Sequence, residues 1–477
     1  MLFPTLTFGL FFLALFAVSW AARASNEWRK ILLLAASWIF YGAWDWRFVA
    51  LLIGSAVVNW ALAEQIAETP AVIDNRRWRR GLLIVGVVAN LAVLATFKYC
   101  GFFLEQVAAT LRALGWQRDF PVLQVVLPVG VSFFTFQGMS YLIDVYRGRT
   151  APARLLDVTL LMSFFAHLVA GPIVRASDLI PQFQRTPRLT REAAATGLLL
   201  IAWGLFKKAV IASQLATGLV DPVFFDPAAH GPLDLAAAAY GYAVQIYCDF
   251  SAYSDMAIGL AALLGYRFPR NFDQPYRAAS LQDFWRRWHI SLSSWLRDYL
   301  YISLGGNRGG TWIACRNLMI TMLLGGLWHG ASWTFVIWGA LHGTVLAGER
   351  LWREFRPKAW PGLPAWIGVL VTFHVVCLGW IFFRAESFGA AMAFLSGLGH
   401  WDVAPAASAA LTVTPLALAL ILAGLSTQAL PPRLVESAGQ RLARAPAIGV
   451  GLALGAVVLA VAAMGPDGVA PFIYYQF

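Results

Sequence analysis

Long apolar blocks separated by short polar segments make up nearly the whole chain. A helix that crosses the hydrocarbon core of a bilayer needs about 20 mostly apolar residues, because only a helix or a closed barrel satisfies its own backbone in lipid. The pattern therefore predicts an all-α polytopic membrane protein with roughly 11 to 13 membrane segments. The apolar blocks run approximately over residues 2–22, 31–63, 81–99, 121–146, 155–174, 193–219, 235–264, 312–348, 363–383, 411–430 and 446–464.

Three of these blocks do not read as single upright helices. Blocks 31–63 and 312–348 are too long for one pass. The first has a natural break at Asp45 and the second has one around residues 329–332. Block 155–174 has arginines on both flanks, so a full crossing would place basic residues on both sides of the membrane. It is predicted to be a re-entrant or half-buried helix, which is tolerated where protein or a water-filled cavity shields its backbone.

Arginine and lysine occur in short clusters between the apolar blocks. Such clusters mark the cytoplasmic loops of multi-pass membrane proteins. Two connecting segments, 221–234 and 401–415, contain no Lys or Arg, so they are expected on the opposite side, the periplasmic side of a bacterial inner membrane. The clusters are Arg23, Arg29 and Lys30; Arg76, Arg77, Arg79 and Arg80; Arg147, Arg149 and Arg154; Arg286, Arg287 and Arg297; Arg350, Arg353 and Arg356; and Arg433, Arg441 and Arg444.

The composition agrees with the membrane assignment: 59% of the residues are hydrophobic, 13% are charged and the mean hydropathy is +0.64. A soluble domain carries about 25% charged residues, and a disordered chain lacks such apolar blocks. The formal net charge of +11 falls in the loop clusters, so it indicates orientation and not a nucleic-acid partner. The four cysteines show no CxxC and no histidine at metal-ligand spacing, which predicts neither a disulfide framework nor a metal site. We expect one membrane domain over residues 1–477, with the first block retained as a helix.

Polar residues inside apolar spans are costly and are functional candidates. Block 235–264 contains Asp249, Ser251 and Asp255. The two carboxylates are six residues apart and lie on opposite faces of a helix, so periodicity alone does not pair them. Residues on the wall of a water-filled cavity would give the same pattern as catalytic residues, and both interpretations stay open.

The stretch from residue 280 to residue 310 combines an aromatic stripe with arginines. Leu281, Phe284, Trp288, Leu292, Trp295 and Tyr299 fall on one helical face, and Arg286, Ser293 and Arg297 on another. This pattern is typical of a helix lying in the membrane interface. His289 lies at the seam between the two faces, where it is either an ordinary interfacial residue or a functional one.

His329 lies deep in an apolar block and is flanked by small residues that allow close approach of backbone or ligand. Burial favours the neutral imidazole, the form that accepts a proton. A histidine hydrogen-bonded across helices would have the same surroundings. His342 and His374 also fall in apolar blocks. His342 would point to another face of a continuous helix, so we expect both to be buried and structural.

The usual soluble catalytic motifs are missing from the sequence. The loop from Gly305 to Gly310 is glycine-rich but lacks the GxxxxGK[ST] pattern of a phosphate-binding loop. There is no GxSxG elbow and no HExxH pair. With these motifs absent, the candidate chemistry that is left is that of histidines inside a membrane.

Two segments together resemble the membrane-bound O-acyltransferase (MBOAT) family: DFWRRWHISLSSWLRDYLYISLGGNRGG and the buried LGGLWHGASWTFVIWGALHG. Within this family the chain looks like the bacterial branch that includes alginate O-acetylase membrane subunits and their relatives in cellulose and peptidoglycan acetylation. Further matches are FAHLVAGPIVR, YCDFSAYSDMAIGLAALLGYRFPRNFDQPY and the terminal FIYYQF, so the resemblance spans nearly the whole chain. His167 departs from it, since a shorter and less basic residue is expected at that position.

The resemblance implies a helical fold around a central tunnel, in which a cytoplasmic donor meets an extracytoplasmic acceptor. It also implies two functional histidines, which fall on His289 and His329. His329 is expected to act as a general base or a transient acyl carrier, and His289 to orient the thioester or stabilise the oxyanion. Arg286, Arg287, Arg308 and Trp328 are expected to bind the donor, and Asp249, Ser251 and Asp255 to line the tunnel.

The expected donor is acetyl-CoA or another acyl thioester, with no bound cofactor. The expected partners are the lipid bilayer, a periplasmic SGNH-type acetyltransferase and a polysaccharide synthesis or export complex. Three alternatives stay open: a transporter, whose broken helices would look similar, a scaffold subunit, and an enzyme that transfers D-alanine to teichoic acid.

Overall fold

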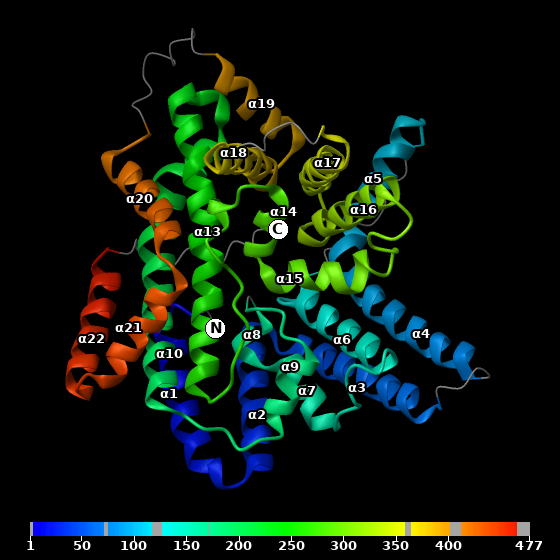
Figure 1. Ribbon diagram of the computed structural model, residues 1–477, viewed down its shortest axis with the longest axis vertical. Helices are drawn as coiled ribbons and strands as arrows, with labels where there is room; N and C mark the ends of the chain where they lie inside the picture. The colour runs from blue at the N-terminus through cyan, green and yellow to red at the C-terminus, as the bar shows by residue number, and fades with distance from the viewer. Residues whose placement is uncertain are drawn as a thin grey trace. The chain divides into compact units, whose positions relative to one another are not determined.

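The computed structural model describes residues 3–70, 75–116, 126–169, 171–357, 364–400 and 412–464. Within these ranges the chain is helical and has no β-strand, which confirms the predicted all-α class (Figure 1). Two compact units are distinguished by their internal contacts. The first is formed by Met1–Leu189 with Leu260–Pro269, and the second by Thr190–Gly259 with Arg270–Phe477.

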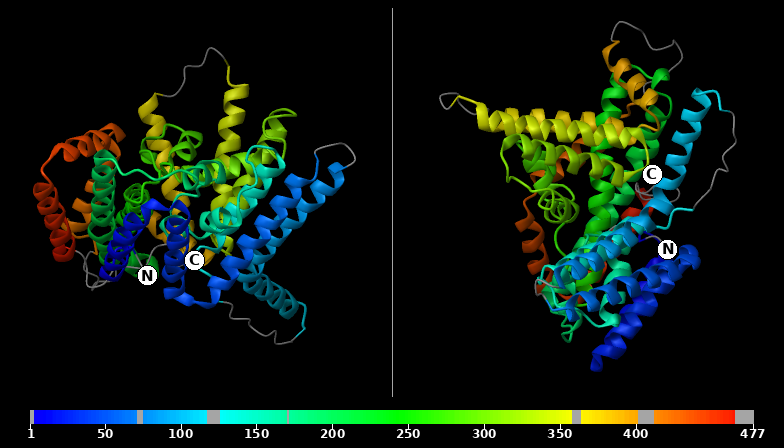
Figure 2. Two further views of the ribbon diagram at one scale, coloured as in Figure 1. Left: turned by 90° about the horizontal axis from the view of Figure 1, so that it is seen from below. Right: turned by 90° about the vertical axis from the view of Figure 1, so that its right-hand side faces the viewer.

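The first unit contains the helices α1 to α9. Among them α3 and α4 lie side by side (Figures 1 and 2). A π turn at Ala95–Tyr99 joins α4 to α5, and a 3-10 turn at Ala22–Ala24 follows α1. The bounds are α1 (Leu6–Ala21), α2 (Asn26–Asp45), α3 (Arg47–Glu68), α4 (Arg76–Leu94), α5 (Cys100–Ala113), α6 (Val131–Tyr146), α7 (Leu155–Ser163), α8 (Phe165–Leu168) and α9 (Ala176–Phe183).

The second unit contains α10 to α22, except that the last turn of α13, from Leu260 onward, belongs to the first unit. The α-helices are α10 (Arg191–Phe206), α11 (Ser213–Leu215), α12 (Asp221–Phe225), α13 (Pro232–Leu263), α14 (Leu281–Arg287), α15 (Ile290–Trp295), α16 (Thr311–His329), α17 (Trp333–Phe355), α18 (Ala365–Arg384), α19 (Phe388–Gly399), α20 (Pro415–Ser426), α21 (Pro432–Arg444) and α22 (Ala447–Met464). The π turns are η4 (Lys207–Ala212), η5 (Ala216–Val220) and η8 (Leu296–Tyr301), and the 3-10 turns are η6 (Pro227–Ala229), η7 (Pro275–Arg277) and η9 (Thr427–Ala429).

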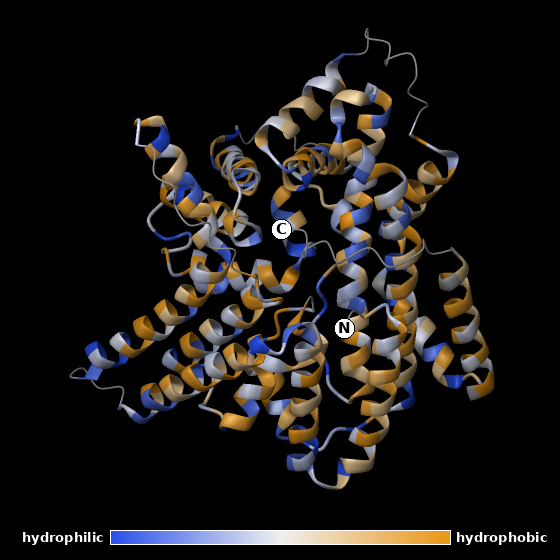
Figure 3. Ribbon diagram, turned by 180° about the vertical axis from the view of Figure 1, so that it is seen from behind, coloured by the Kyte–Doolittle hydropathy of each residue, from blue (hydrophilic) through white to orange (hydrophobic). Residues whose placement is uncertain are grey.

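Five helical stretches among the described residues are long and apolar enough to cross a membrane, and the bent pair formed by α20 and α21 would make a sixth. Hydrophobic residues run along most helices, and hydrophilic residues gather toward helix ends and loops (Figure 3). The chain is therefore a multi-pass protein, and the larger count of membrane segments stays a prediction. The five stretches are Leu6–Ala24, Arg47–Glu68, Arg76–Ala113, Arg191–Phe225 and Ala365–Arg384. Residues 121–125, 401–411 and 472–477, used in the sequence predictions, lie outside the described ranges.

The predicted helix breaks are confirmed. α2 ends at Asp45 before α3 begins, and α16 ends at His329 before α17 begins at Trp333. Block 155–174 is also broken, because α7 and α8 are separated at Phe164. With nine residues, α7 is too short to cross a bilayer, since it extends about 14 Å. From Asp157 onward every residue of α7 is buried in protein.

The amphipathic stretch around His289 is not one continuous helix, although its periodicity is unbroken. α14 ends at Arg287 and α15 begins at Ile290, while His289 adopts the left-handed region with φ 42° and ψ 55°. Backbone hydrogen bonds to a preceding segment replace the helical ones. The Asp273 N–H donates to the Arg287 carbonyl and the Ile290 N–H donates to the Asn271 carbonyl, both at 2.9 Å. These bonds come from residues distant in sequence, so the aromatic periodicity gave no sign of them.

Arg29 and Lys30, predicted to mark a loop, are buried within the first unit. Arg29 donates to the Leu264 carbonyl at 2.6 Å and to the Tyr266 hydroxyl at 2.9 Å. Lys30 forms an ion pair with Asp157 at 2.8 Å. A buried cation is tolerated when it is paired and hydrogen-bonded, so these two residues hold α2 in place and do not lie in a loop.

Glycines bring α16 and α17 into close contact just before His329. A Cβ atom on Gly326 would lie 2.2 Å from the Phe335 carbonyl oxygen, and one on Gly339 would lie 2.3 Å from the Met322 carbonyl oxygen. Backbone therefore packs directly on backbone here. The prediction that small residues near His329 permit close approach is confirmed.

Candidate active site

His289 is fully buried at the break between α14 and α15. Its ring stands edge-on to Phe250 with centroids 4.6 Å apart, and its centroid is 6.3 Å from the ring of Trp328. The Nδ1 atom lies 3.2 Å from Oδ1 of Asn271. The Nε2 atom has no hydrogen-bond partner among the residues that the structure describes.

His329 is the last residue of α16 and only 4% of its surface is exposed. Three aromatic rings surround it: Trp328 at 4.9 Å, Trp338 at 5.1 Å and Phe383 at 5.1 Å between centroids. The ring of Trp328 thus contacts His329 and also stands near His289. The structure brings the two histidines singled out in the sequence to one aromatic cluster.

His342 belongs to the same cluster, although a continuous helix would have directed it elsewhere. The break before α17 changes its direction, and its ring lies 4.6 Å from that of Trp338. Trp285 donates its indole N–H to Nδ1 of His342 at 3.3 Å. His374 is exposed on α18 beside Tyr240, so the expectation that it is buried is wrong.

The polar residues of α13 are paired with two lysines that the sequence analysis missed. Lys207 donates to Ser251 at 2.6 Å and to Asp255 at 2.7 Å. Lys208 pairs with Asp249 at 2.9 Å. The two carboxylates point to different partners, as their spacing indicated. The signal that could have identified the lysines is their position inside the apolar block 193–219.

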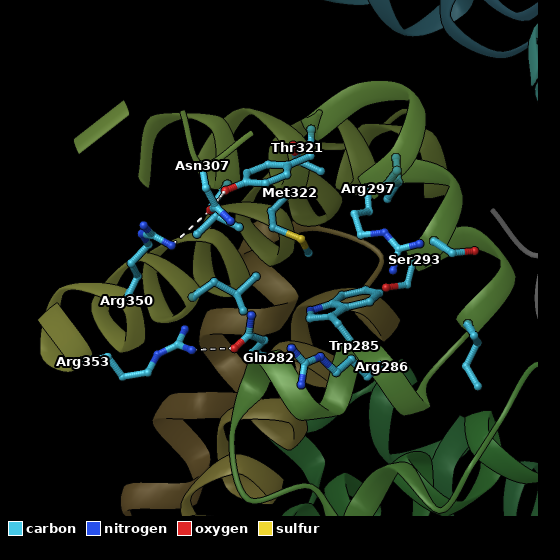
Figure 4. A pocket seen from close by; sticks show the side chains of 16 residues that line it. Gln282, Trp285, Arg286, Ser293, Arg297, Asn307, Thr321, Met322, Arg350 and Arg353 are labelled. Atoms are coloured by element: carbon cyan, nitrogen blue, oxygen red, sulfur yellow. Dashed lines mark hydrogen bonds between the residues drawn. The ribbon is translucent and has the colours of Figure 1, made fainter. Parts of the chain in front are cut away.

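An arginine-rich cavity of about 390 Å³ lies in the second unit (Figure 4). Four guanidinium groups face it, from Arg286 on α14, Arg297 on η8, and Arg350 and Arg353 on α17. The apolar part of its lining includes Trp285, the residue that binds His342. The cavity therefore combines a cationic rim with an aromatic wall that reaches the histidine cluster.

Polar side chains contact three of the four cavity arginines, and Arg297 forms an ion pair with Asp298 at 2.7 Å. Arg350 donates to Asn307 at 3.1 Å and Arg353 donates to Gln282 at 2.7 Å (Figure 4). Both acceptors are neutral amides, so these two bonds leave the positive charge of each arginine uncompensated.

Of the three arginines predicted to bind the donor, only one lines the cavity. Arg286 lines the cavity. Arg287 does not line it and instead pairs with Asp283 at 2.9 Å. Arg308 is exposed in the glycine-rich loop and is also outside the lining. Arg297, Arg350 and Arg353 line the cavity although their clusters in the sequence predicted only cytoplasmic loops.

His167 lies in the first unit and is buried there. Its Nε2 atom is 3.0 Å from the Leu161 carbonyl oxygen and 2.7 Å from the side-chain amide of Gln137. Its ring packs against Phe164 and Phe268. These contacts account for the residue as part of the packing of this unit. Among the described residues, no group of three or more His, Cys, Asp or Glu side chains is placed to hold a metal ion.

The fold and the site define a multi-pass helical membrane protein with buried histidines and a cationic cavity. Residues 153–392 match the sequence model of MBOAT, the membrane-bound O-acyltransferase family. The chain belongs to this family, and it is a membrane O-acyltransferase. This membership favours the enzyme over the transporter and scaffold alternatives.

Curated relatives are similar over most of the chain. The probable alginate O-acetylase AlgI of Azotobacter vinelandii is 45% identical over 358 residues, which are 72% of this chain and 68% of the relative. The probable alginate O-acetylase AlgI of Pseudomonas aeruginosa is 42% identical over 401 residues, 82% of this chain and 74% of the relative. The peptidoglycan O-acetyltransferase of Helicobacter pylori is 39% identical over 373 residues, 72% of this chain and 69% of the relative.

Proposed function

We propose that this O-acyltransferase moves an acetyl group from a cytoplasmic thioester, acetyl-CoA, across the bacterial inner membrane toward O-acetylation of an exported polysaccharide such as alginate. The observation that carries the proposal is the placement of His289 and His329 around Trp328 in a member of this family. The names of the relatives support acetyl as the acyl group and a cell-envelope polymer as the acceptor. The whole chain, residues 1–477, acts as one acyltransferase domain in this proposal.

The arginine-rich cavity is the proposed donor site. Guanidinium groups bind phosphate through charge-assisted and often bidentate hydrogen bonds, which suits the phosphates of coenzyme A. Arg286 is the predicted donor-binding residue that lines this cavity, and Arg297, Arg350 and Arg353 join it. Arg287 and Arg308 lie outside the cavity lining and remain proposed donor contacts. Trp328 is proposed to pack against the thioester arm near the histidines.

The proposed reaction divides between the two histidines. His329 accepts the proton of the acceptor hydroxyl while the oxygen of this hydroxyl attacks the thioester carbonyl. The C–S bond then breaks, and the coenzyme leaves as a thiol after it takes up this proton. Alternatively, an imidazole nitrogen of His329 attacks the thioester carbonyl, the C–S bond breaks and the coenzyme leaves as a thiolate. The acceptor hydroxyl then attacks the acyl-histidine, which restores the free imidazole, and the hydroxyl proton goes to the thiolate. His289 orients the thioester or supports the oxyanion. The aromatic surroundings keep water from hydrolysing the thioester.

The acceptor is proposed to be a hydroxyl of a periplasmic SGNH-type acetyltransferase, which then modifies the polymer. Asp249, Ser251 and Asp255 are proposed to line the path between the two sides. The ion pairs of Asp255 with Lys207 and of Asp249 with Lys208 keep such a polar path electrically neutral.

Replacement of His329 tests the proposed function. We expect His329→Ala to lower acetyl transfer by about 100-fold or more, because positioned acid–base catalysis contributes about 10²- to 10⁴-fold. The measurement is the release of coenzyme A and transfer of labelled acetyl by the full chain in detergent, with His374→Gln as control because that histidine is exposed on α18. Equal rates for His329→Ala and the unmodified protein would refute the assignment.

The same assay separates acetyl transfer from D-alanyl transfer. The protein is offered acetyl-CoA or a D-alanyl thioester of a carrier protein, each with labelled acyl group. We expect turnover with acetyl-CoA. Turnover with the D-alanyl thioester alone would show that the acyl group has been misassigned.

A further inference from the structure

We propose that Asn271 is a positioning residue that holds His289 as the Nδ1–H tautomer and so leaves Nε2 as a hydrogen-bond acceptor inside the site. This inference rests on the proposed function of His289 and deepens it. Asn271 lies between α13 and α14, in the segment that is hydrogen-bonded to the helix break. It was not among the residues that the sequence analysis named.

The orientation of the Asn271 carboxamide is determined by its neighbours. The backbone N–H of Ser291 points at one terminal atom of this side chain from 3.1 Å. A backbone N–H can only donate, so this atom is the carbonyl oxygen Oδ1. At the other end, the Nδ2 amide donates to the Ser254 hydroxyl on α13 at 3.0 Å. The oxygen therefore faces His289, and the reversed amide would place donor against donor.

The orientation of Asn271 determines the tautomer of His289. Nδ1 of the histidine lies 3.2 Å from Oδ1, and a hydrogen bond to this oxygen requires a proton on Nδ1. The Ser291 hydroxyl donates its proton to the same oxygen at 2.9 Å, so its own oxygen, 3.5 Å from Nδ1, can only accept from that nitrogen. In the neutral ring the lone pair is then on Nε2, which has no hydrogen-bond partner among the described residues. Neutral His289 can accept a hydrogen bond from the thioester arm or a hydroxyl, and it can support an oxyanion only after it has taken up a proton.

The main chain of Asn271 supports the same arrangement. Its carbonyl oxygen accepts the Ile290 N–H at 2.9 Å, directly after the left-handed His289. One residue thus holds the backbone on the C-terminal side of His289 and one nitrogen of its ring. The backbone bond does not depend on the side chain, so variants of Asn271 keep the break between α14 and α15.

The test uses tautomer-sensitive NMR on the full chain in detergent with labelled histidine. The protein has seven histidines, and the signals of His289 are identified by their loss in His289→Gln. We expect the Nδ1–H tautomer in the unmodified protein and a mixture, or the Nε2–H tautomer, in Asn271→Ala.

In the acetyl-transfer assay, kcat of Asn271→Ala should fall by about tenfold or more while KM for acetyl-CoA changes little. Asn271→Asp keeps an acceptor oxygen toward both Nδ1 and Ser291, so it should restore the tautomer and part of kcat.

Ser291→Ala is the matched control. It removes one donor from the same oxygen but keeps the backbone N–H that orients the amide, so the tautomer should not change. The proposal is overturned if unmodified His289 shows the Nε2–H tautomer, or if Asn271→Ala keeps both the Nδ1–H tautomer and kcat. An unchanged rate in His289→Gln would instead refute the function proposed for this histidine, whatever tautomer the spectra show.

Discussion

Lys207 and Lys208 are neighbours in the chain, yet each neutralises a different carboxylate of α13. The side chains of Lys208 and Asp249 are 1% and 4% exposed. Taking two charges out of water is costly, and their attraction offsets this cost only when the geometry of the pair is good. The consequence is asymmetric: removing one partner leaves a buried charge, whereas removing both leaves none.

This asymmetry gives a prediction about stability. Lys208→Met should lower the free energy of unfolding by about 3 to 5 kcal/mol, because it leaves the Asp249 carboxylate buried without its lysine. The double variant Lys208→Met with Asp249→Leu should recover much of the loss, since no charge remains. Thermal unfolding in detergent measures both. If the double variant is at least as unstable as the single one, the ion pair is not the source of the effect.

Individual site residues were predicted unevenly from the sequence. His329 stands out because a histidine in an apolar block is rare, whereas His289 was singled out by the resemblance to the MBOAT family. The structure brings both to Trp328. Asn271 has no such signal, because an asparagine in a loop is ordinary and its role depends on Ser291 and Ser254. Whether the two histidines catalyse the reaction stays a prediction.

At the scale of elements, the contact between α16 and α17 positions His329. Gly326 lies three residues before it, and a Cβ atom there would meet the Phe335 carbonyl at 2.2 Å. Backbone cannot move aside as a flexible side chain can, so any larger residue must push the two helices apart.

Gly326→Ala is therefore expected to lower both the melting temperature and the acetyl-transfer rate. A displacement of about 1 Å at a catalytic group can cost about 100-fold in rate, so activity should respond more strongly than stability. Gly348→Ala on α17 is the matched control, because no atom lies within 4 Å of its added Cβ. It should be neutral or slightly stabilising, since alanine favours a helix. Equal behaviour of the two variants would contradict the close-packing argument.

Elements were predicted well where a local cause produces them. Asp45 and the residues after His329 interrupt apolar runs, and the helices end there. The break at His289 has a tertiary cause, since backbone bonds from Asn271 and Asp273 replace helical bonds in a stretch whose periodicity is unbroken. Local pattern contains no information about such partners.

At the scale of the whole molecule, basic residues that a charge count treats alike occupy different environments. The excess of Lys and Arg was interpreted as loop orientation, and the motifs identified the family that residues 153–392 confirm. The structure then distributes these charges: Arg29 is buried within the first unit, while Arg286, Arg297 and Arg350 converge on one cavity of the second. Convergence depends on the packing of α14, η8 and α17, so it could not be predicted from positions along the chain.

The cavity leads to a prediction about donor recognition by the assembled protein. Arg286→Glu should raise KM for acetyl-CoA by about tenfold with little change in kcat, because a charge-assisted hydrogen bond contributes about 1.5 to 3 kcal/mol and Arg286 is exposed enough for solvent to weaken it. Acetyl-pantetheine lacks the nucleotide phosphates of the coenzyme, so its KM should be the same for the variant and the unmodified protein.

Arg356→Glu is the control for this prediction. It makes the same charge change at an exposed residue just past the end of α17, outside the cavity lining. Steady-state kinetics are measured at two salt concentrations. The difference in KM for acetyl-CoA between Arg286→Glu and the unmodified protein should be smaller at the higher concentration, because salt screens the charges. A KM that rises equally for both donors would mean that Arg286 acts on the thioester arm or on folding, and the cavity would not be the phosphate site.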